Sequence, residues 1–245
     1  MDGDAVREVK ELAREAAGEA TVVEIDGRPY STVSLQAQKP PQPDALDVHT
    51  LTGLVDFIAA NRDELSLGEC VLHVLDEQTV ELRGPLEEGF QQRPTYARAT
   101  CRDRLAAARF SFGSFQPTEQ VVIALQALFA DREDRADVLA LVGNVTDEAL
   151  RTQADDGVTQ EVTARSGVSV IEEREVENPY TLAPFRTFTE VDQPASPFVL
   201  RLQKSERKGI TAALFESDGG AWKDEAIQRI ADYLGKELSE PAIIA

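Results

Sequence analysis

Histidine, cysteine and acidic side chains are the groups in this sequence whose types could do chemistry. The chain has two histidines, His49 and His73, and two cysteines, Cys70 and Cys101. A structural zinc ion takes four such ligands at short, regular spacings, and a serine or cysteine nucleophile needs a histidine held beside it. These four residues do not have the spacing of zinc ligands, and the two histidines belong to no recognisable catalytic motif. We therefore expect no metal site and no histidine-assisted nucleophile.

Motifs that hold phosphates or activate a nucleophile are also missing from the sequence. It has no glycine-rich phosphate loop, no His-Glu-x-x-His and no Gly-x-Ser-x-Gly. Asp218-Gly219-Gly220 precedes a predicted helix whose N-terminus could hold an anion, but the aspartate would repel it. This segment is better interpreted as a turn and cap. We expect no cofactor and no catalytic residues, so the chain is predicted not to be an enzyme. Carboxylate-only hydrolysis stays open, because 44 acidic residues bring some pairs together in nearly any fold.

The net charge of −19 is the strongest global feature of the sequence. Proteins that bind nucleic acids use clustered Lys and Arg to displace counterions, and no such cluster occurs here. We therefore expect no direct contact with nucleic acid. The acidic residues are scattered, which is typical of a soluble, self-repelling surface. An acidic surface that imitates DNA remains an alternative.

Several features of the sequence indicate that the protein is located in the cytoplasm. No run of about 18 apolar residues is present, so we expect no membrane span. The first eight residues are acidic and helix-forming, unlike a signal or transit peptide. Cys70 and Cys101 lie in predicted strands and are interpreted as small buried hydrophobic residues, which suits a reducing compartment.

Hairpin signals and amphipathic helices alternate along the chain. Asp26-Gly27 predicts a tight hairpin turn, and Thr50 can cap a helix whose apolar stripe begins at Leu51. The first predicted helix, residues 4–17, carries a stripe with Val6, Val9 and Leu12. Because β-α-β repeats are absent, we predict one α+β domain over residues 1–245. Its sheet is expected to be built from antiparallel hairpins, with amphipathic helices packed on it.

The C-terminal segment 178–238 is predicted to be a strand-hairpin-helix unit. Two β-rich runs are joined by Ser205–Gly209, and a helix follows Asp218-Gly219-Gly220. Trp222 lies at the start of this helix, and we expect it to be buried as the structural anchor of the helix on the hairpin 197–216.

Two segments are expected to contact other subunits. Pro40, Pro41 and Pro43 exclude a helix and a central strand from residues 36–47, so this segment is predicted to be an extended arm. The tail, residues 241–245, contains Ile243 and Ile244, which have no partner in the pattern of the final helix. An exposed apolar pair is unusual unless it docks somewhere.

Roughly the last 75 residues contain a pattern formed by residues 184–191, Gln193-Pro194, 196–198 and 214–222. By this pattern the C-terminal third resembles the YfdQ-like family of uncharacterised phage and prophage proteins. The family has no established activity or catalytic residues, so no residue role transfers. The resemblance implies a phage or prophage origin and a location in the bacterial host cytoplasm.

The sequence favours a self-assembling protein over two alternatives. The missing catalytic motifs, the proline-rich arm and the apolar tail fit a subunit of a homo-oligomer, such as a ring or a closed capsid-like or encapsulin-like shell. The first alternative is an acidic DNA mimic or decoy that inhibits host defence, with a host protein as partner. The second is an accessory factor of phage nucleic-acid metabolism.

Overall fold

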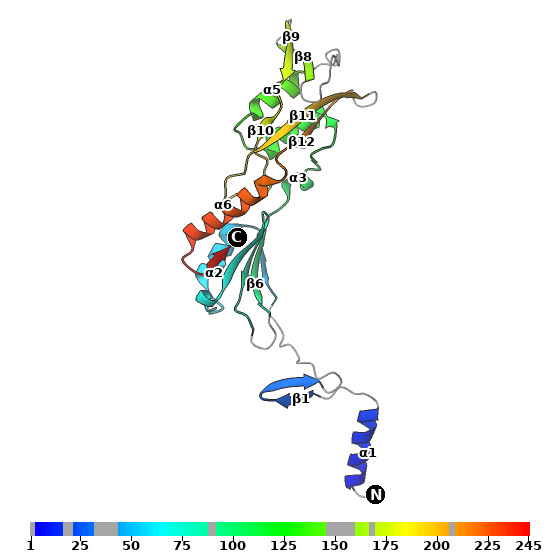
Figure 1. The fold of residues 1–245 in the computed structure, drawn as a ribbon, viewed down its shortest axis with the longest axis vertical. Coiled ribbons are helices and arrows are strands. Elements are labelled where there is room, and N and C mark those ends of the chain that lie inside the picture. The colour runs from blue at the N-terminus through cyan, green and yellow to red at the C-terminus, as the bar shows by residue number, and fades with distance from the viewer. Residues whose placement is uncertain are drawn as a thin grey trace. The chain divides into compact units, whose positions relative to one another are not determined.

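The protein has an α+β fold, as predicted, in which helices accompany sheets that are mostly antiparallel (Figure 1). The computed structural model describes residues 3–16, 22–31, 44–87, 92–145, 160–166, 170–205 and 209–245. The chain forms two compact units. The first comprises residues 1–43 and 87–92, and the second comprises residues 44–86 and 93–245.

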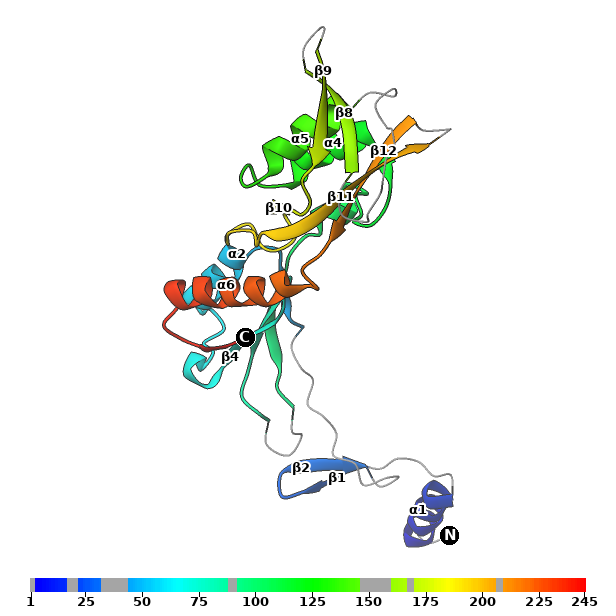
Figure 2. The same ribbon diagram turned by 45° about the horizontal axis from the view of Figure 1, so that its top comes forward.

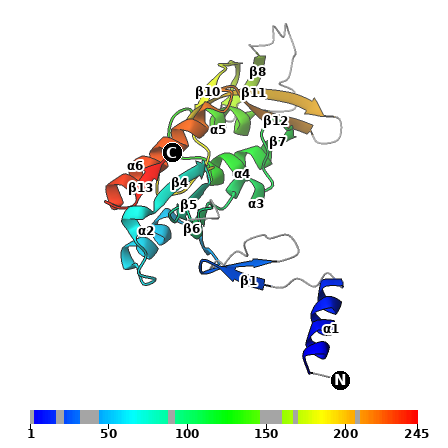
Figure 3. The same cartoon turned by 60° about the horizontal axis from the view of Figure 1, so that its bottom comes forward.

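The first unit contains a helix and a hairpin (Figure 3). The helix is α1 (Gly3–Ala16), and the hairpin strands are β1 (Val22–Ile25) and β2 (Arg28–Ser31). Asp26 and Gly27 have φ angles of 52° and 75°, the left-handed conformations that a two-residue hairpin turn requires. The hairpin predicted at Asp26-Gly27 is therefore confirmed. Pro40, Pro41 and Pro43 lie outside the described residues.

A five-stranded sheet and two helices form one part of the second unit, with a core of its own. In spatial order its strands are β13 (Ala242–Ile244), β4 (Val71–Asp76), β5 (Thr79–Arg83), β6 (Thr95–Thr100) and β3 (Leu46–Val48). The three middle strands are antiparallel, whereas both edge strands run parallel to their neighbours. α2 (Leu51–Ala60) and α6 (Ala221–Glu237) lie beside this sheet, as Figure 2 shows, and a short 3-10 turn, η1 (Leu67–Glu69), precedes β4.

A four-stranded antiparallel sheet belongs to the other part of the second unit, which has a separate core. In spatial order its strands are β10 (Tyr180–Leu182), β11 (Ser196–Ser205), β12 (Gly209–Glu216) and β7 (Gln116–Pro117). Its helices are α4 (Thr118–Leu128) and α5 (Arg135–Asn144); α3 (Arg104–Ala107) is one short turn. A separate hairpin pairs β8 (Gln160–Ser166) with β9 (Val170–Val176).

Local signals explain several of these elements. The Thr50 hydroxyl accepts a hydrogen bond from the Gly53 N–H at 3.0 Å, so the predicted cap of α2 is confirmed. The predicted β11–β12 hairpin is also present, with Ser205 opposite Gly209 at its end. Gly209 has a φ of 68°, which a residue with a side chain rarely adopts.

The packing of the last helix corrects the sequence prediction. Ile230 and Leu234 of α6 are buried in one core with Leu72 of the five-stranded sheet. The β11–β12 hairpin contributes instead to a second core, which it shares with α4 and α5. The helix therefore does not pack on the hairpin that precedes it. An apolar stripe shows that a helix is packed, but it does not specify which sheet covers it.

The segment between β10 and β11 connects the two cores. Phe188 and Val191 are buried in the core of the five-stranded sheet, although β10 and β11 belong to the four-stranded sheet. The buried side-chain amide of Gln193 holds this segment together through four hydrogen bonds to its backbone. Its Oε1 accepts the N–H groups of Arg186 and Thr187 at 3.0 and 3.2 Å. Its Nε2 donates to the carbonyls of Phe188 and Val191 at 2.9 and 3.2 Å.

Candidate interaction site

Trp222, the predicted anchor, is buried as expected, with 7% of its surface exposed. It packs on a charged partner, since Arg186 Cζ lies 3.8 Å from the centroid of its ring. The two terminal nitrogens of Arg186 hydrogen-bond to Glu216 Oε1 and Ser196 Oγ. Arg186 thus joins the connecting segment, the end of β12 and the start of α6. Burial lowers the pKa of Arg186, while the charge of Glu216 acts in the opposite direction.

Asp218 caps the start of α6, in agreement with its interpretation as a turn and cap residue. Its carboxylate accepts hydrogen bonds from Gly220 N at 2.9 Å, Ser196 Oγ at 2.8 Å and Trp222 N at 3.3 Å. Partial burial by itself raises the pKa of Asp218. The three hydrogen bonds and the positive charge of Arg186 outweigh this effect, so the pKa lies below its ordinary value.

A cavity of about 540 Å³ lies next to this cluster and includes Arg186 and Trp222 in its lining. Three charged groups of the lining, Glu77, Arg186 and Glu216, already have partners. Arg186 is paired with Glu216, and Glu77 with Lys223 at 3.0 Å. These ion pairs are typical of a structural joint between elements, so we assign the cluster a packing role.

The C-terminal tail is an edge strand of the five-stranded sheet. Ile243 lies opposite Leu72 of β4 and Ile244 opposite His73. Ile243 packs against the core, whereas Ile244 remains 51% exposed. The assumption that the tail has no partner in its own chain is therefore wrong for Ile243. A contact of Ile244 with another subunit stays a prediction.

The four histidine and cysteine side chains are dispersed. Cys70 is buried, and Cys101 is half-buried; burial raises the pKa of both thiols. His73 is half-buried on β4, and His49 Nδ1 lies 3.2 Å from the Thr100 carbonyl oxygen. Within the described residues, no three His, Cys, Asp or Glu side chains come together as metal ligands. No described helix is long and apolar enough to cross a membrane.

The apolar stripe of α1 is exposed to solvent. Val6 is 48% exposed, Val9 66% and Leu12 59%, and they follow one another at the three-residue spacing of a single helix face. A monomer normally leaves apolar side chains exposed singly, and a contiguous exposed stripe marks a binding surface. We define Val6, Val9 and Leu12 as the α1 stripe.

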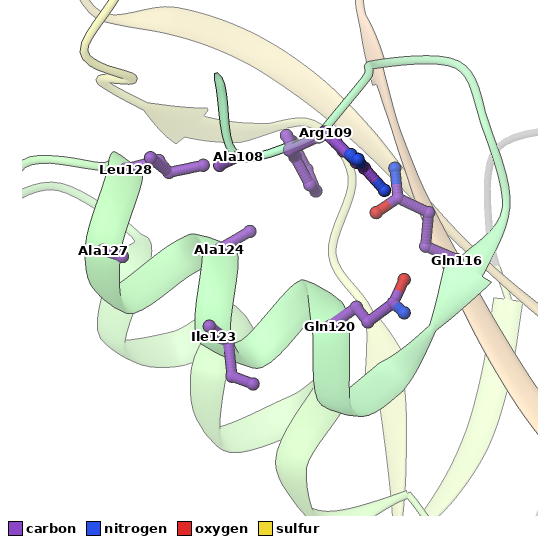
Figure 4. A pocket seen from close by; sticks show the side chains of 9 residues that line it. Ala108, Arg109, Gln116, Gln120, Ile123, Ala124, Ala127 and Leu128 are labelled. Atoms are coloured by element: carbon purple, nitrogen blue, oxygen red, sulfur yellow. The ribbon is translucent and has the colours of Figure 1, made fainter. Parts of the chain in front are cut away.

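A second apolar surface lies along α4. A groove of about 290 Å³ separates this helix from the turn at residues 108–110. Figure 4 shows Arg109 and Gln116 turned toward one another at one end, and Leu128 near the other. We call this surface the α4 groove; it is lined by Ala108, Arg109, Phe110, Gln116, Gln120, Ile123, Ala124, Ala127 and Leu128.

Backbone hydrogen bonds shape the turn that forms one wall of the α4 groove. Phe110 N donates to Leu105 O and Arg109 N to Ala106 O, both at 3.0 Å, which closes the C-terminus of α3. Arg109 consequently adopts a φ of 56° and stays exposed at the end of the groove, while Phe110 is buried.

Ile123 of α4 is 55% exposed in the groove. The helical pattern places it outside the buried side of α4, which includes Val121, Leu125 and Leu128. A large apolar residue off the buried stripe was therefore the sequence signal that could have indicated this surface. The position of Arg109 had no such signal, because it depends on how α3 ends.

Comparison with known proteins gives no match: no family model, no curated protein and no solved structure matches the chain.

Proposed function

We propose that this chain is a phage- or prophage-encoded, non-enzymatic protein that assembles with copies of itself into a ring or closed shell. The resemblance of its C-terminal third to the YfdQ-like family supports the phage origin. The single observation that carries the proposed assembly is the exposed α1 stripe, in which Val6, Val9 and Leu12 are each about half exposed or more.

The length of α1 supports the need for a partner. An isolated helix shorter than about 12–15 residues is marginal in water, because helical stability in proteins comes mostly from packing one apolar face. α1 has 14 residues and its apolar face is open to solvent. Burial of a Val or Leu side chain contributes about 1.5–3 kcal/mol, so three of them stabilise both the helix and an interface.

The test replaces the stripe without changing the net charge. Val9→Gln with Leu12→Gln removes its apolar character, and glutamine is a better helix former than valine. Arg7→Gln with Glu11→Gln changes the opposite face of the same helix and also leaves the net charge unchanged. Mass is measured by size-exclusion chromatography with light scattering, at low and moderate salt.

We expect the intact chain and the Arg7/Glu11 control to be oligomeric, and the Val9/Leu12 variant to dissociate. A monodisperse intact chain of 26.8 kDa at both salt concentrations contradicts the proposal and makes the acidic decoy the leading alternative. If the Val9/Leu12 variant assembles to the same mass as the Arg7/Glu11 control, this result also contradicts the proposal that the α1 stripe carries the assembly.

A further inference from the structure

Two described apolar surfaces, one in each unit, are open to solvent: the α1 stripe and the α4 groove. We propose that α1 of one copy docks into the α4 groove of a neighbouring copy. This inference rests on the proposed self-assembly, and it names the two surfaces that meet. A helix laying one apolar face into a groove is a common mode of recognition, in which residues three or four positions apart act as anchors.

The two surfaces agree in length. From Val6 to Leu12 the α1 stripe advances about 9 Å, at 1.5 Å per residue. The α4 wall of the groove, from Gln120 to Leu128, advances about 12 Å on the same basis. Three anchors therefore fit along the groove, where they would cover the exposed Ile123.

Their charges are also complementary. Glu8 lies on the flank of the α1 stripe, one turn before Leu12 on the same side of the helix, and it is exposed. Arg109 is exposed at one end of the α4 groove, and its guanidinium has no ion pair with any residue that the structure describes. Docking that brings Glu8 to Arg109 would direct Leu12 toward Leu128 at the far end (Figure 4).

Such a contact joins two different surfaces, so each copy both inserts a helix and receives one. Contacts of this kind generate rings where the rotation closes and open filaments where it does not. A symmetric α1–α1 pair would instead stop at a dimer.

The experiment uses full-length chains and mixes two defective variants. One carries Val9→Gln with Leu12→Gln and keeps an intact groove. The other carries Ile123→Gln with Ala127→Gln and keeps an intact α1. Gln126→Ala, an exposed change on α4 outside the groove lining, is the matched control. Circular dichroism and the thermal midpoint of each variant check that it is folded.

We expect each defective variant alone to self-associate at least about tenfold more weakly than the intact chain, since two apolar anchors are lost. An equimolar mixture should form a complex of two chains, because one intact helix meets one intact groove. A groove variant that assembles like the Gln126→Ala control, or a mixture that stays monomeric, overturns the inference. An intact chain that assembles would still support the proposed function in either case, whereas a monomeric intact chain overturns both.

A charge exchange tests the docking direction. Glu8→Arg and Arg109→Glu should each weaken self-association about twofold to fivefold, the range for an exposed ion pair, and the double variant should recover it. Both single variants shift the net charge by two, in opposite directions, and the double variant restores it. If the double variant is weaker than either single variant, the assignment of Glu8 to Arg109 is wrong.

Discussion

Arg186 lies over the indole ring of Trp222, with its Cζ 3.8 Å from the ring centroid. The two residues are 5% and 7% exposed, so the contact is largely shielded from water. A cation–π contact of this kind stabilises by about 2 kcal/mol when it is desolvated. It attaches the start of α6 to the segment that connects the two cores.

Trp222→Ala should reduce the free energy of unfolding by about 3–5 kcal/mol, because it removes a buried ring and the surface on which Arg186 lies. Urea unfolding followed by circular dichroism measures this cost. Trp222→Phe keeps an aromatic face and should cost clearly less. As Trp222 is the sole tryptophan, the native chain should have blue-shifted fluorescence. Emission typical of water-exposed indole would show that its placement is wrong.

Gln193→Ala should destabilise the chain by about 4 kcal/mol, since its amide makes four hydrogen bonds that each contribute about 1 kcal/mol. The same substitution at the exposed Gln203 is the control, and it should change stability by less than about 0.5 kcal/mol. Urea midpoints of the two variants give the comparison. Equal effects would mean that the Gln193 amide does not hold the connecting segment.

Asp218→Asn should destabilise the chain by about 0.3–1 kcal/mol at neutral pH, because it removes a negative charge at the N-terminus of α6, whereas the amide oxygen can still accept hydrogen bonds. The pKa of Asp218 is lowered in the folded state, so its stabilising effect is fully present above the unfolded pKa of about 3.9 and is lost as pH falls through the folded pKa. The stability difference from the native chain should therefore be constant between pH 5 and 7 and shrink below about pH 4. Unfolding curves across this range measure it.

The exposed Asp63 provides a matched control for that experiment. Asp63→Asn should shift stability by no more than about 0.5 kcal/mol. A difference for Asp218→Asn that grows as the pH falls would contradict the direction of its pKa shift.

Ile243 and Ile244 should respond differently to the same substitution. Ile243→Gln should reduce the free energy of unfolding by about 1–3 kcal/mol, because Ile243 packs against the core behind β4. Ile244→Gln should leave stability nearly unchanged, as the side chain is 51% exposed, and should lower the mass measured by light scattering. If Ile244→Gln has no effect on mass, the predicted subunit contact of the tail is absent.

Assembly should strengthen as salt rises. Each copy carries a net charge of −19, so the copies repel one another, and the screening length falls from about 10 Å at 0.1 M to about 3 Å at 1 M. Salt also weakens the proposed contact of Glu8 with Arg109, but one exposed pair is small beside this overall repulsion. Light scattering at 0.05, 0.15 and 0.5 M NaCl tests the direction. A mass that falls with salt would contradict it.

Short-range signals predicted much of the fold. The turn at Asp26-Gly27, the cap at Thr50 and the hairpin around Ser205 and Gly209 each depend on neighbouring residues, and all are present. The stripe of α1 could likewise be predicted from its spacing. Its exposure could not, because periodicity shows which side chains share a face but not whether anything covers it.

The sequence by itself determined the α+β class, the hairpins at Asp26-Gly27 and Ser205–Gly209, the helix that follows the Thr50 cap, and the burial of Trp222. Only the tertiary structure decided that α6 packs on the five-stranded sheet, that β13 runs parallel beside β4, and that Arg186 lies over Trp222. It also placed Arg109 at the end of the α4 groove. These relationships join residues far apart in the chain or depend on how a short helix ends. Helical and strand periods carry no information about which distant element completes a core, because any apolar face of suitable size could do so.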